Sequence, residues 1–289
     1  MITAKIITDS KNIIGERLTT FLLVYPRFIH SEFMTHRMFS RNAASSRAIP
    51  IEKMIKAIED NPAMPIHWGK IQKGMQADVE VDDETKVKAK EIWLNAMKDA
   101  IKHSRALAGL EIHKQIANRL TEPFAHMMTL VTATEWENFT ALRAHKDAQP
   151  EIRDLGYKML MEYNLSIPKL LQDNEWHLPF GDEIDEEIFN TTLNNHPELT
   201  DIGLKLKIAT ARCARTSYTT PETLQKHNYE SDIRLHDELK QNGHFSPFEH
   251  IAEPRQQWAP IRWVGNFKGW TQYRKTLLGE SRTDSRIKK

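Results

Sequence analysis

Apolar positions near the start of the chain alternate with turn residues in a way that predicts a β-hairpin. A β-prone run at residues 4–8 is followed by Asn and Gly, and then by a second apolar run, 18–25, closed by Pro26. Two apolar runs separated by such turn chemistry are typical of paired antiparallel strands. A further strand is expected within residues 121–134, which are rich in Thr, Val and Met.

Much of the remaining chain repeats its apolar residues at helical spacing. The helices expected from this spacing cover residues 27–38, 51–59, 83–107, 110–120, 135–143, 151–166, 208–218 and 231–241. Residues 40–47 and 61–76 lack the period and are read as loops, and the acidic, turn-rich stretch 174–206 favours a linker or insertion. Gly243 is predicted to stop the last helix, since glycine accepts a left-handed C-cap.

Composition excludes several classes of protein. Of the 289 residues, 40% are hydrophobic and 27% charged, which is ordinary for a globular domain, and the net charge of +1 offers no basic field for nucleic acid. The single cysteine, Cys213, excludes an intrachain disulfide or a cysteine-based zinc site and favours a reducing compartment. The N-terminus does not resemble a signal peptide, and no apolar run approaches the ~20 residues of a membrane helix. A cytoplasmic protein with neither membrane nor nucleic-acid partner is expected.

A polar segment at residues 35–47, THRMFSRNAASSR, sets three Arg and one His among serines and an asparagine. Guanidinium groups beside hydroxyls and free N–H groups suit a phosphate, because Arg donates two parallel hydrogen bonds. A solvated polar loop is an equally good interpretation of this segment on its own.

The segment at residues 243–250, GHFSPFEH, crowds two His and one Glu around a proline and two phenylalanines. A metal site is conceivable from these side chains, but their spacing matches no zinc pattern and no second cluster completes it. A capped turn with a buried aromatic pair is the preferred interpretation.

Residues 136–153, WENFTALRAHKDAQPEIR, predict two amphipathic helices. Asn138 and Arg143 lie about five residues apart and could address one pocket. The second helix is expected to begin with Asp147 as its cap, Pro150 near its first position and Glu151 at the positive end of the helix dipole.

Taken together, these three segments resemble the flavin-dependent thymidylate synthase family. The family signature, Arg-His-Arg followed after seven residues by Ser, is matched in spacing by Thr35-His36-Arg37 and Ser45. The family's GHxSPFEH turn is matched in full by residues 243–250, and ALR at 141–143 with AQPEIR at 148–153 resembles its NLR and AQxEIR segments. In the family the turn precedes the signature, whereas in this chain the turn follows the signature. This order indicates a circular permutation. Such a rearrangement is tolerated when the old termini lie close together.

The resemblance implies an α+β fold of the thymidylate synthase-complementing type, an antiparallel sheet flanked by helices, as one domain over residues 1–289. Within it, residues 51–118 would be a helical insertion, 180–206 an acidic linker and 207–280 the permuted segment. The resemblance also implies a homotetramer with shared active sites, in which FAD, NADPH and methylenetetrahydrofolate convert dUMP to dTMP. That chemistry needs no cysteine nucleophile, so Cys213 is expected to be structural.

The matching positions imply specific roles for the site residues. The residues expected to contact FAD are His36, Arg37, Asn138, Ser246 and Glu249. The residues expected to bind the nucleotide are Ser45, Arg47, Arg119 and Arg143. Arg143 would also act in catalysis by favouring the ionised N3 of the pyrimidine, and His244 would lie near the flavin and substrate as the second catalytic residue.

Several positions depart from the family pattern. The departing residues are Thr35, Ala43, Ala48, Glu32, Thr132 and Thr134, which stand where the family has Arg, Glu, Tyr, Gln, Asn and Arg. Gln272 and Arg274 in the permuted segment are candidates to replace lost contacts. The departures leave two alternatives open: a flavin enzyme acting on another pyrimidine nucleotide, by dUMP hydroxymethylation or dCMP modification, or a non-catalytic nucleotide-binding homologue.

Overall fold

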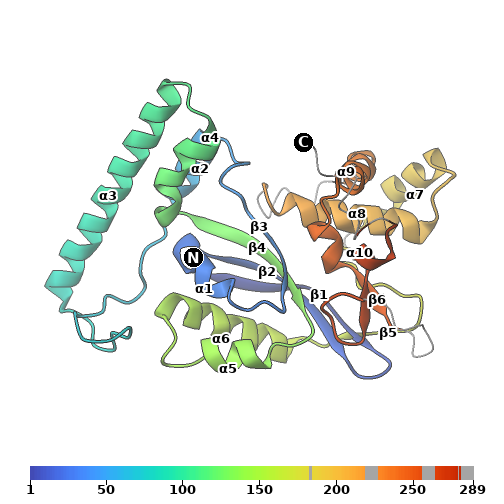
Figure 1. Cartoon of the computed structure of the whole chain (residues 1–289), viewed down its shortest axis with the longest axis horizontal. Helices are drawn as coiled ribbons and strands as arrows, with labels where there is room; N and C mark the ends of the chain where they lie inside the picture. The colour runs from blue at the N-terminus through green and yellow to red at the C-terminus, as the bar shows by residue number, and fades with distance from the viewer. Residues whose placement is uncertain (182–183, 219–226, 256–263, 279, 281–289) are drawn as a thin grey trace.

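A five-stranded sheet forms the centre of the computed structural model, which describes residues 1–181, 184–218, 227–255, 264–278 and 280 (Figure 1). The strand order is β3-β4-β2-β1-β5. The strands are β1 (Thr3–Asn12), β2 (Arg17–Pro26), β3 (Ser40–Ala43), β4 (His126–Ala133) and β5 (Lys169–Leu171). Helices flank this sheet, so the expected α+β fold is confirmed. The pairing is antiparallel except at one edge, where β5 runs parallel to β1.

The predicted hairpin and the predicted strand near residue 130 are both confirmed. β1 pairs with β2 through a turn containing Gly15, whose φ is 94°, and β2 pairs with β4 from Thr19↔Ala133 to Pro26↔His126. Apolar residues of β2 do not alternate with exposed polar residues, because helices and turns cover both faces of the strand and almost every position is buried.

The polar stretch read as a loop contains an edge strand instead. β3 pairs with β4 from Ser40↔Thr132 to Ala43↔Thr129, and its polar side chains Ser40 and Asn42 are buried. Their partners come from far along the chain: Asn42 donates to the carbonyl of Cys213 at 3.2 Å. A local pattern could not show these partners, and so the loop prediction was wrong for residues 40–43.

One face of the sheet packs against α5 (Glu137–Arg143) and α6 (Pro150–Leu165), both as predicted. Odd-numbered residues of β2 point to this side, and Phe21 meets Trp136 edge-on at 5.1 Å. The cap prediction was wrong in one detail: Gln149, not Asp147, is the N-cap of α6, although Pro150 is its first residue as expected.

The other face carries the C-terminal half of the chain. Even-numbered residues of β2 and β4 pack there against Cys213 of α8 (Asp201–Arg215), which is fully buried. α8 in turn packs against α9 (Tyr229–Asn242), whose C-cap Gly243 has the predicted left-handed φ of 72°. The predicted helices 208–218 and 231–241 are thus confirmed, with the first beginning earlier.

A helix lies inside the stretch expected to be turn-rich. α7 (Glu186–Asn195) begins with two glutamates capped by Asp185 and buries Phe189 against Leu204, Ile208 and Tyr229. Acidic residues stabilise the positive end of a helix, so this charge run marks a helix start.

Residues 51–118 form an arm beside the sheet (Figure 1). It contains α2 (Ile51–Asp60), the 27-residue α3 (Asp83–Gly109) and the single turn α4 (Lys114–Ala117), with a small core around Ile55, Ile58 and Ile101. The helix expected over 110–120 is therefore mostly absent, because Glu111 adopts a φ of 59° after α3 and η2 (Asn118–Phe124) follows α4 as a 3-10 helix.

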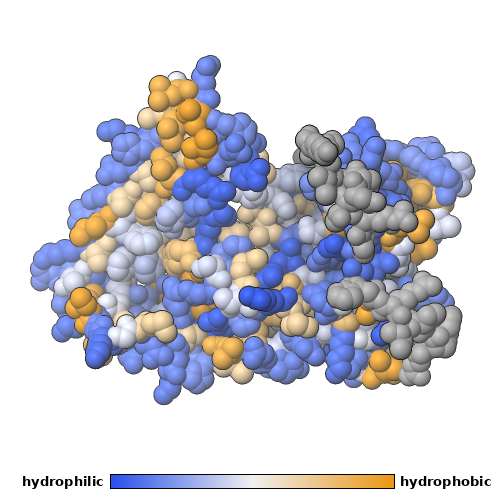
Figure 2. Space-filling view, viewed as in Figure 1, coloured by the Kyte–Doolittle hydropathy of each residue, from blue (hydrophilic) through white to orange (hydrophobic). Residues whose placement is uncertain are grey.

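The helix expected over residues 27–38 is also shorter than predicted. It consists of η1 (Arg27–Ile29) and α1 (His30–Phe33). Within the described part of the chain, no helix is long and apolar enough to cross a bilayer. The molecular face in Figure 2 is largely hydrophilic, with apolar atoms gathered at the upper end of the arm.

The left-handed cap of α9 gives a test of the fold. Replacing Gly243 by Ala should lower the free energy of unfolding by about 1–2 kcal/mol, because a Cβ disfavours positive φ. Gly109→Ala is the matched control, since Gly109 is helical and a Cβ there meets nothing within 4 Å. Urea denaturation should show the control unchanged or stabilised, and equal losses in both variants would contradict the assignment of the cap.

Candidate functional site

Arg143 and the signature segment meet at the end of α5. The guanidinium of Arg143 donates from Nε to Nε2 of His36 at 3.0 Å and from Nη2 to the hydroxyl of Thr35 at 3.2 Å. These partners are 107 and 108 residues away along the chain. Two predicted site residues are therefore in direct contact, and Thr35, a departure from the family pattern, takes part in their network.

The His36 imidazole is neutral at pH 7, accepting a hydrogen bond through Nε2 and carrying an N–H donor at Nδ1. Burial, followed by the positive charges of Arg143 and Arg41, lowers the pKa of His36 to about 4. Because Nε2 accepts from Arg143, the neutral ring must carry its hydrogen on Nδ1. The ring is also fixed edge-on against Phe139 at 4.9 Å. The arrangement thus offers an oriented N–H group beside a permanent positive charge.

A cleft of about 900 Å³ opens beside this pair. Arg143, Glu32 and residues 146–151 form one side, and residues 65–78 of the arm contribute to the other. Burial raises the pKa of Glu32, against the opposing charge of Arg143. Its Oε2 atom is buried and has no hydrogen-bond partner among the residues that the structure describes. The cleft therefore combines the positive charge of Arg143 with a carboxylate oxygen of Glu32 that has no hydrogen-bond partner among the described residues.

Arg119, one of the predicted nucleotide-binding residues, lies elsewhere, in a cluster around Glu122. One carboxylate oxygen of Glu122 accepts from the Ser46 hydroxyl at 2.5 Å and from Arg119 at 2.9 Å, and it forms an ion pair with Arg27 at 3.0 Å. Ser45 and Arg47 flank Ser46, and the side chains of Arg47 and Arg119 are exposed. This group is a surface cluster, and no hydrogen bond or ion pair between described residues joins it to the cleft at Arg143.

The GHFSPFEH segment contains the expected buried aromatic pair, at a short 3-10 helix that has no side-chain cap. η4 (Ser246–His250) buries Phe248, which meets the buried Phe245 edge-on at 5.7 Å. His244 and Ser246 are exposed. No group of three His, Cys, Asp or Glu in the described ranges is placed to hold a metal ion.

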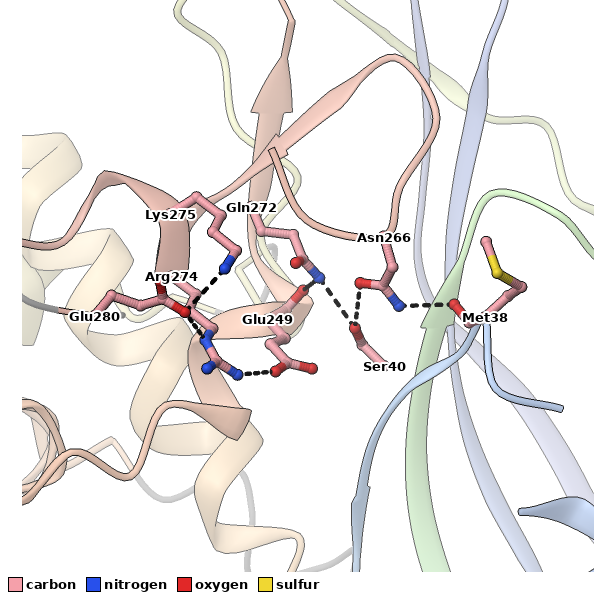
Figure 3. Close-up of polar contacts among 8 residues, drawn as sticks. All are labelled: Met38, Ser40, Glu249, Asn266, Gln272, Arg274, Lys275 and Glu280. Atoms are coloured by element: carbon pink, nitrogen blue, oxygen red, sulfur yellow. Dashed lines mark hydrogen bonds and ion pairs between the residues drawn. The ribbon is translucent and has the colours of Figure 1, made fainter. Parts of the chain in front are cut away.

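Residues 264–274 attach this turn to the signature segment (Figure 3). Gln272, on β7 (Trp270–Gln272), donates from Nε2 to the Ser40 hydroxyl at 3.0 Å and to the Glu249 carbonyl at 2.9 Å. The carboxylate of Glu249 pairs with Arg274. Asn266 donates to the carbonyl of Met38 at 2.8 Å and accepts from Ser40 at 3.2 Å. The turn and the signature strand are thereby held side by side.

Two further departures from the family pattern serve the same attachment. The hydroxyl of Thr132 lies 2.8 Å from Nδ1 of His250, and the hydroxyl of Thr134 accepts from the backbone N–H of Lys268 at 3.1 Å. Asn266 was missed in the sequence, since its partner Met38 is 228 residues away. The only signal in the sequence was the neighbouring glycine, Gly265. In the structure its φ is 106°, and a Cβ there would lie 1.9 Å from Oε1 of Gln272.

Arg37 and Asn138 are exposed, close in sequence to His36 and to Phe139 respectively. Neither side chain makes a recorded hydrogen bond within the described chain. The structure therefore brings the predicted site residues into three places: the His36–Arg143 pair, the Glu122 cluster with Ser45, Arg47 and Arg119, and the turn with His244, Ser246 and Glu249.

Comparison with known proteins identifies the family. Residues 13–169, more than half of the chain, match the family model described as thymidylate synthase complementing protein, and the chain belongs to that family. The solved structures with a similar fold include the UMP/dUMP methylase PolB from Streptomyces cacaoi. Bound with 5-Br UMP, it is 16% identical, with a TM-score of 0.47 over 56% of this chain and 88% of that chain. Bound with 5-Br dUMP, it is 17% identical, with a TM-score of 0.47 over 56% and 90%. No curated protein matches the chain in sequence.

The electrostatic coupling at the pair can be measured. Arg143→Gln should raise the pKa of His36 from about 4 toward its ordinary 6.5, because a nearby positive charge is removed while burial remains. Lys146→Gln removes a cation of the same cleft that does not act on His36, and is the control. Histidine titration by NMR should separate the two variants. An unshifted His36 in Arg143→Gln would contradict the contact.

The bridge through Gln272 should contribute measurably to stability. Gln272→Leu keeps the size of the side chain but removes the donors to Ser40 and to the Glu249 carbonyl, so the free energy of unfolding should fall by about 1–3 kcal/mol. Gln241→Leu, at an exposed position of α9, should have little effect. Denaturant titration compares the two, and similar values would rule out the bridge.

Proposed function

We propose that this protein is an FAD-dependent thymidylate synthase that methylates dUMP to dTMP with methylenetetrahydrofolate and NADPH. Membership of the thymidylate synthase complementing protein family supports the proposal. The observation that carries it is the direct contact of His36 with Arg143 beside a cleft of about 900 Å³. That volume is within the ~300–1,000 Å³ typical of small-molecule sites.

The polar groups around the signature segment fit a flavin. In this proposal His36, Arg37 and Asn138 bind FAD from one side, and Ser246 and Glu249 bind it from the turn. Ser40 lies four positions after His36, at most about 14 Å of extended chain, and Gln272 ties Ser40 to Glu249. The candidate contacts therefore follow one continuous strip. When bound, reduced FAD would supply the hydride and the folate would supply the carbon.

Arg143 would hold the pyrimidine ring. Its guanidinium is permanently charged and is oriented by His36 and Thr35, so it can stabilise negative charge on N3 and O4 and thereby make C5 a better nucleophile. We assign the second catalytic position to His244, which is exposed at the start of the turn.

Ser45, Arg47 and Arg119 would bind the nucleotide phosphate. They lie at the Glu122 cluster, apart from the Arg143 cleft, which supports a homotetramer in which neighbouring subunits complete each site. The attachment of residues 264–274 to the signature strand supports the interpretation of 207–280 as a permuted segment. A cytoplasmic location without nucleic-acid partners completes the proposal.

A second pyrimidine remains a candidate because of one observation. The unpartnered buried oxygen of Glu32 is an acceptor in the same cleft as Arg143. A carboxylate accepts readily from the exocyclic amine of cytosine, so dCMP is a specific alternative substrate beside dUMP. Hydroxymethylation of dUMP is the other related reaction. A non-catalytic nucleotide-binding homologue would bind the nucleotide without turnover.

The proposal predicts retained flavin and turnover of dUMP. Purified protein loaded with FAD and then desalted should absorb at about 450 nm, and should yield dTMP from dUMP, NADPH and methylenetetrahydrofolate. Arg143→Ala should lower kcat by about 10²–10³-fold, because a preorganised charge at the ring is lost. Lys146→Ala, in the same cleft, is the matched control. Mass analysis of products from dUMP and dCMP distinguishes the two substrates.

The remaining outcomes separate the alternatives. A yellow protein that modifies dCMP, or adds a hydroxymethyl group to dUMP, would replace thymidylate synthesis by the related chemistry. A protein that binds nucleotide but retains no FAD at any concentration would be the non-catalytic homologue.

A further inference from the structure

Five polar side chains form an unbroken line of hydrogen-bond contacts through the interior. Ser10 Oγ lies 2.9 Å from His177 Nδ1, and His177 Nε2 lies 2.8 Å from Thr20 Oγ1. Thr20 Oγ1 lies 2.7 Å from Thr132 Oγ1, which lies 2.8 Å from His250 Nδ1. Ser10, Thr20 and Thr132 belong to the adjacent strands β1, β2 and β4, and the histidines lie on segments that follow the sheet in sequence.

The line is shielded from water along its whole length. None of the five residues is more than 2% exposed. Burial lowers the pKa of both His177 and His250 to about 3, so each imidazole is neutral and carries one hydrogen at neutral pH. Each of the three hydroxyls also carries one hydrogen. The four contacts must therefore be filled from a fixed set of five hydrogens.

Counting these hydrogens leaves three arrangements that fill all four contacts, each with one hydrogen to spare. If every bond runs from Ser10 toward His250, both rings carry their hydrogen on Nε2. If every bond runs from His250 toward Ser10, both rings carry it on Nδ1. In the third arrangement His177 carries it on Nε2 and His250 on Nδ1, so both rings donate to the threonines and the spare hydrogen belongs to a threonine.

The same count excludes one combination of tautomers. With the hydrogen on Nδ1 of His177 and on Nε2 of His250, two acceptors face each other somewhere along the line, and one contact is not made. An unmade buried hydrogen bond is costly because water cannot replace the partner. At least one of the two histidines therefore donates to a threonine.

We infer that Ser10, His177, Thr20, Thr132 and His250 act as one hydrogen-bonded line that positions the Ser246–His250 turn, and that at least one of the two histidines donates its N–H to a threonine of the line. Nδ1 is the anchored nitrogen of His250, because its Nε2 atom is buried and without a partner in the described structure. The neighbouring carbonyl, of Glu249, accepts a hydrogen bond from Gln272 (Figure 3). The turn is thus attached both to the interior of the sheet and to residues 264–274.

The consequence for ligand binding rests on the proposed function, in which Ser246 and Glu249 bind FAD. Thr132 and His177 would then be positioning residues for the cofactor, although neither would touch it. Arg143, the proposed nucleotide-binding residue, lies on α5, and its hydrogen bonds go to His36 and Thr35 and not to this line of buried side chains. Breaking the line of hydrogen bonds should therefore weaken FAD binding and leave nucleotide binding unchanged.

The tautomers can be read directly in the wild-type protein. Long-range ¹⁵N–¹H spectra of histidine-labelled protein distinguish the two neutral tautomers, with His177→Gln and His250→Gln to assign the signals among the 13 histidines. A hydrogen on Nε2 of His177, on Nδ1 of His250, or on both is the expected result. A hydrogen on Nδ1 of His177 together with one on Nε2 of His250, or a charged ring at pH 7, would overturn the inference, and this measurement needs no cofactor.

Thr132→Val tests the positioning role, with Thr132→Ser as the conservative control that retains the hydroxyl. In Thr132→Val, the FAD dissociation constant should rise about tenfold while that of dUMP stays the same, because one buried hydrogen bond is lost at the turn. Thr132→Ser should retain the wild-type affinity for FAD. Equal FAD affinity in a folded Thr132→Val protein would overturn the positioning role. If the wild type binds no FAD, the proposed function fails, while the spectra still decide which tautomers the two histidines have.

Discussion

The antiparallel pairing of β2 with β4 is the constraint on which the rest of the structure depends. The two strands are joined by a hundred residues of chain, yet they pair continuously from Thr19 to Pro26. This register places α5 so that Arg143 reaches His36, and it sets Thr20 opposite Thr132. A slip of one residue would exchange the two faces of β4 and separate both contacts.

Attachment of the C-terminal segment is the second condition for a complete site. Two residues that depart from the family pattern take part in this attachment: Thr132 contacts His250, and Thr134 contacts the backbone at Lys268. Together with Gln272 and Asn266, these contacts hold the GHFSPFEH turn against the signature strand. Substitutions that look like losses of ligand contacts therefore have a structural role in joining two segments that are distant along the chain.

The arm of residues 51–118 changes the surroundings of Arg143. Its loop at residues 65–78 lines the cleft beside Glu32, so the walls of the candidate substrate site come partly from a segment outside the family motifs. Ile66 donates its backbone N–H to Glu151 at 2.8 Å, which fastens this loop to the start of α6. In the proposed function, the selectivity of the site would depend on the arm as well as on the motif residues.

Local pattern determined a large part of this protein. Alternation and turn chemistry predicted the hairpin, helical spacing predicted α2, α3, α5, α6, α8 and α9, and Gly243 marked its helix end, because short-range sterics and periodic burial decide such features. The motifs determined the family and the candidate residues.

Tertiary structure alone decided the rest. It made residues 40–43 a strand, paired Arg143 with a neutral His36, and linked Ser10 to His250 through the interior. These features depend on partners more than eighty residues apart, and a buried polar side chain is stable only when such a partner is present. No local pattern contains that information.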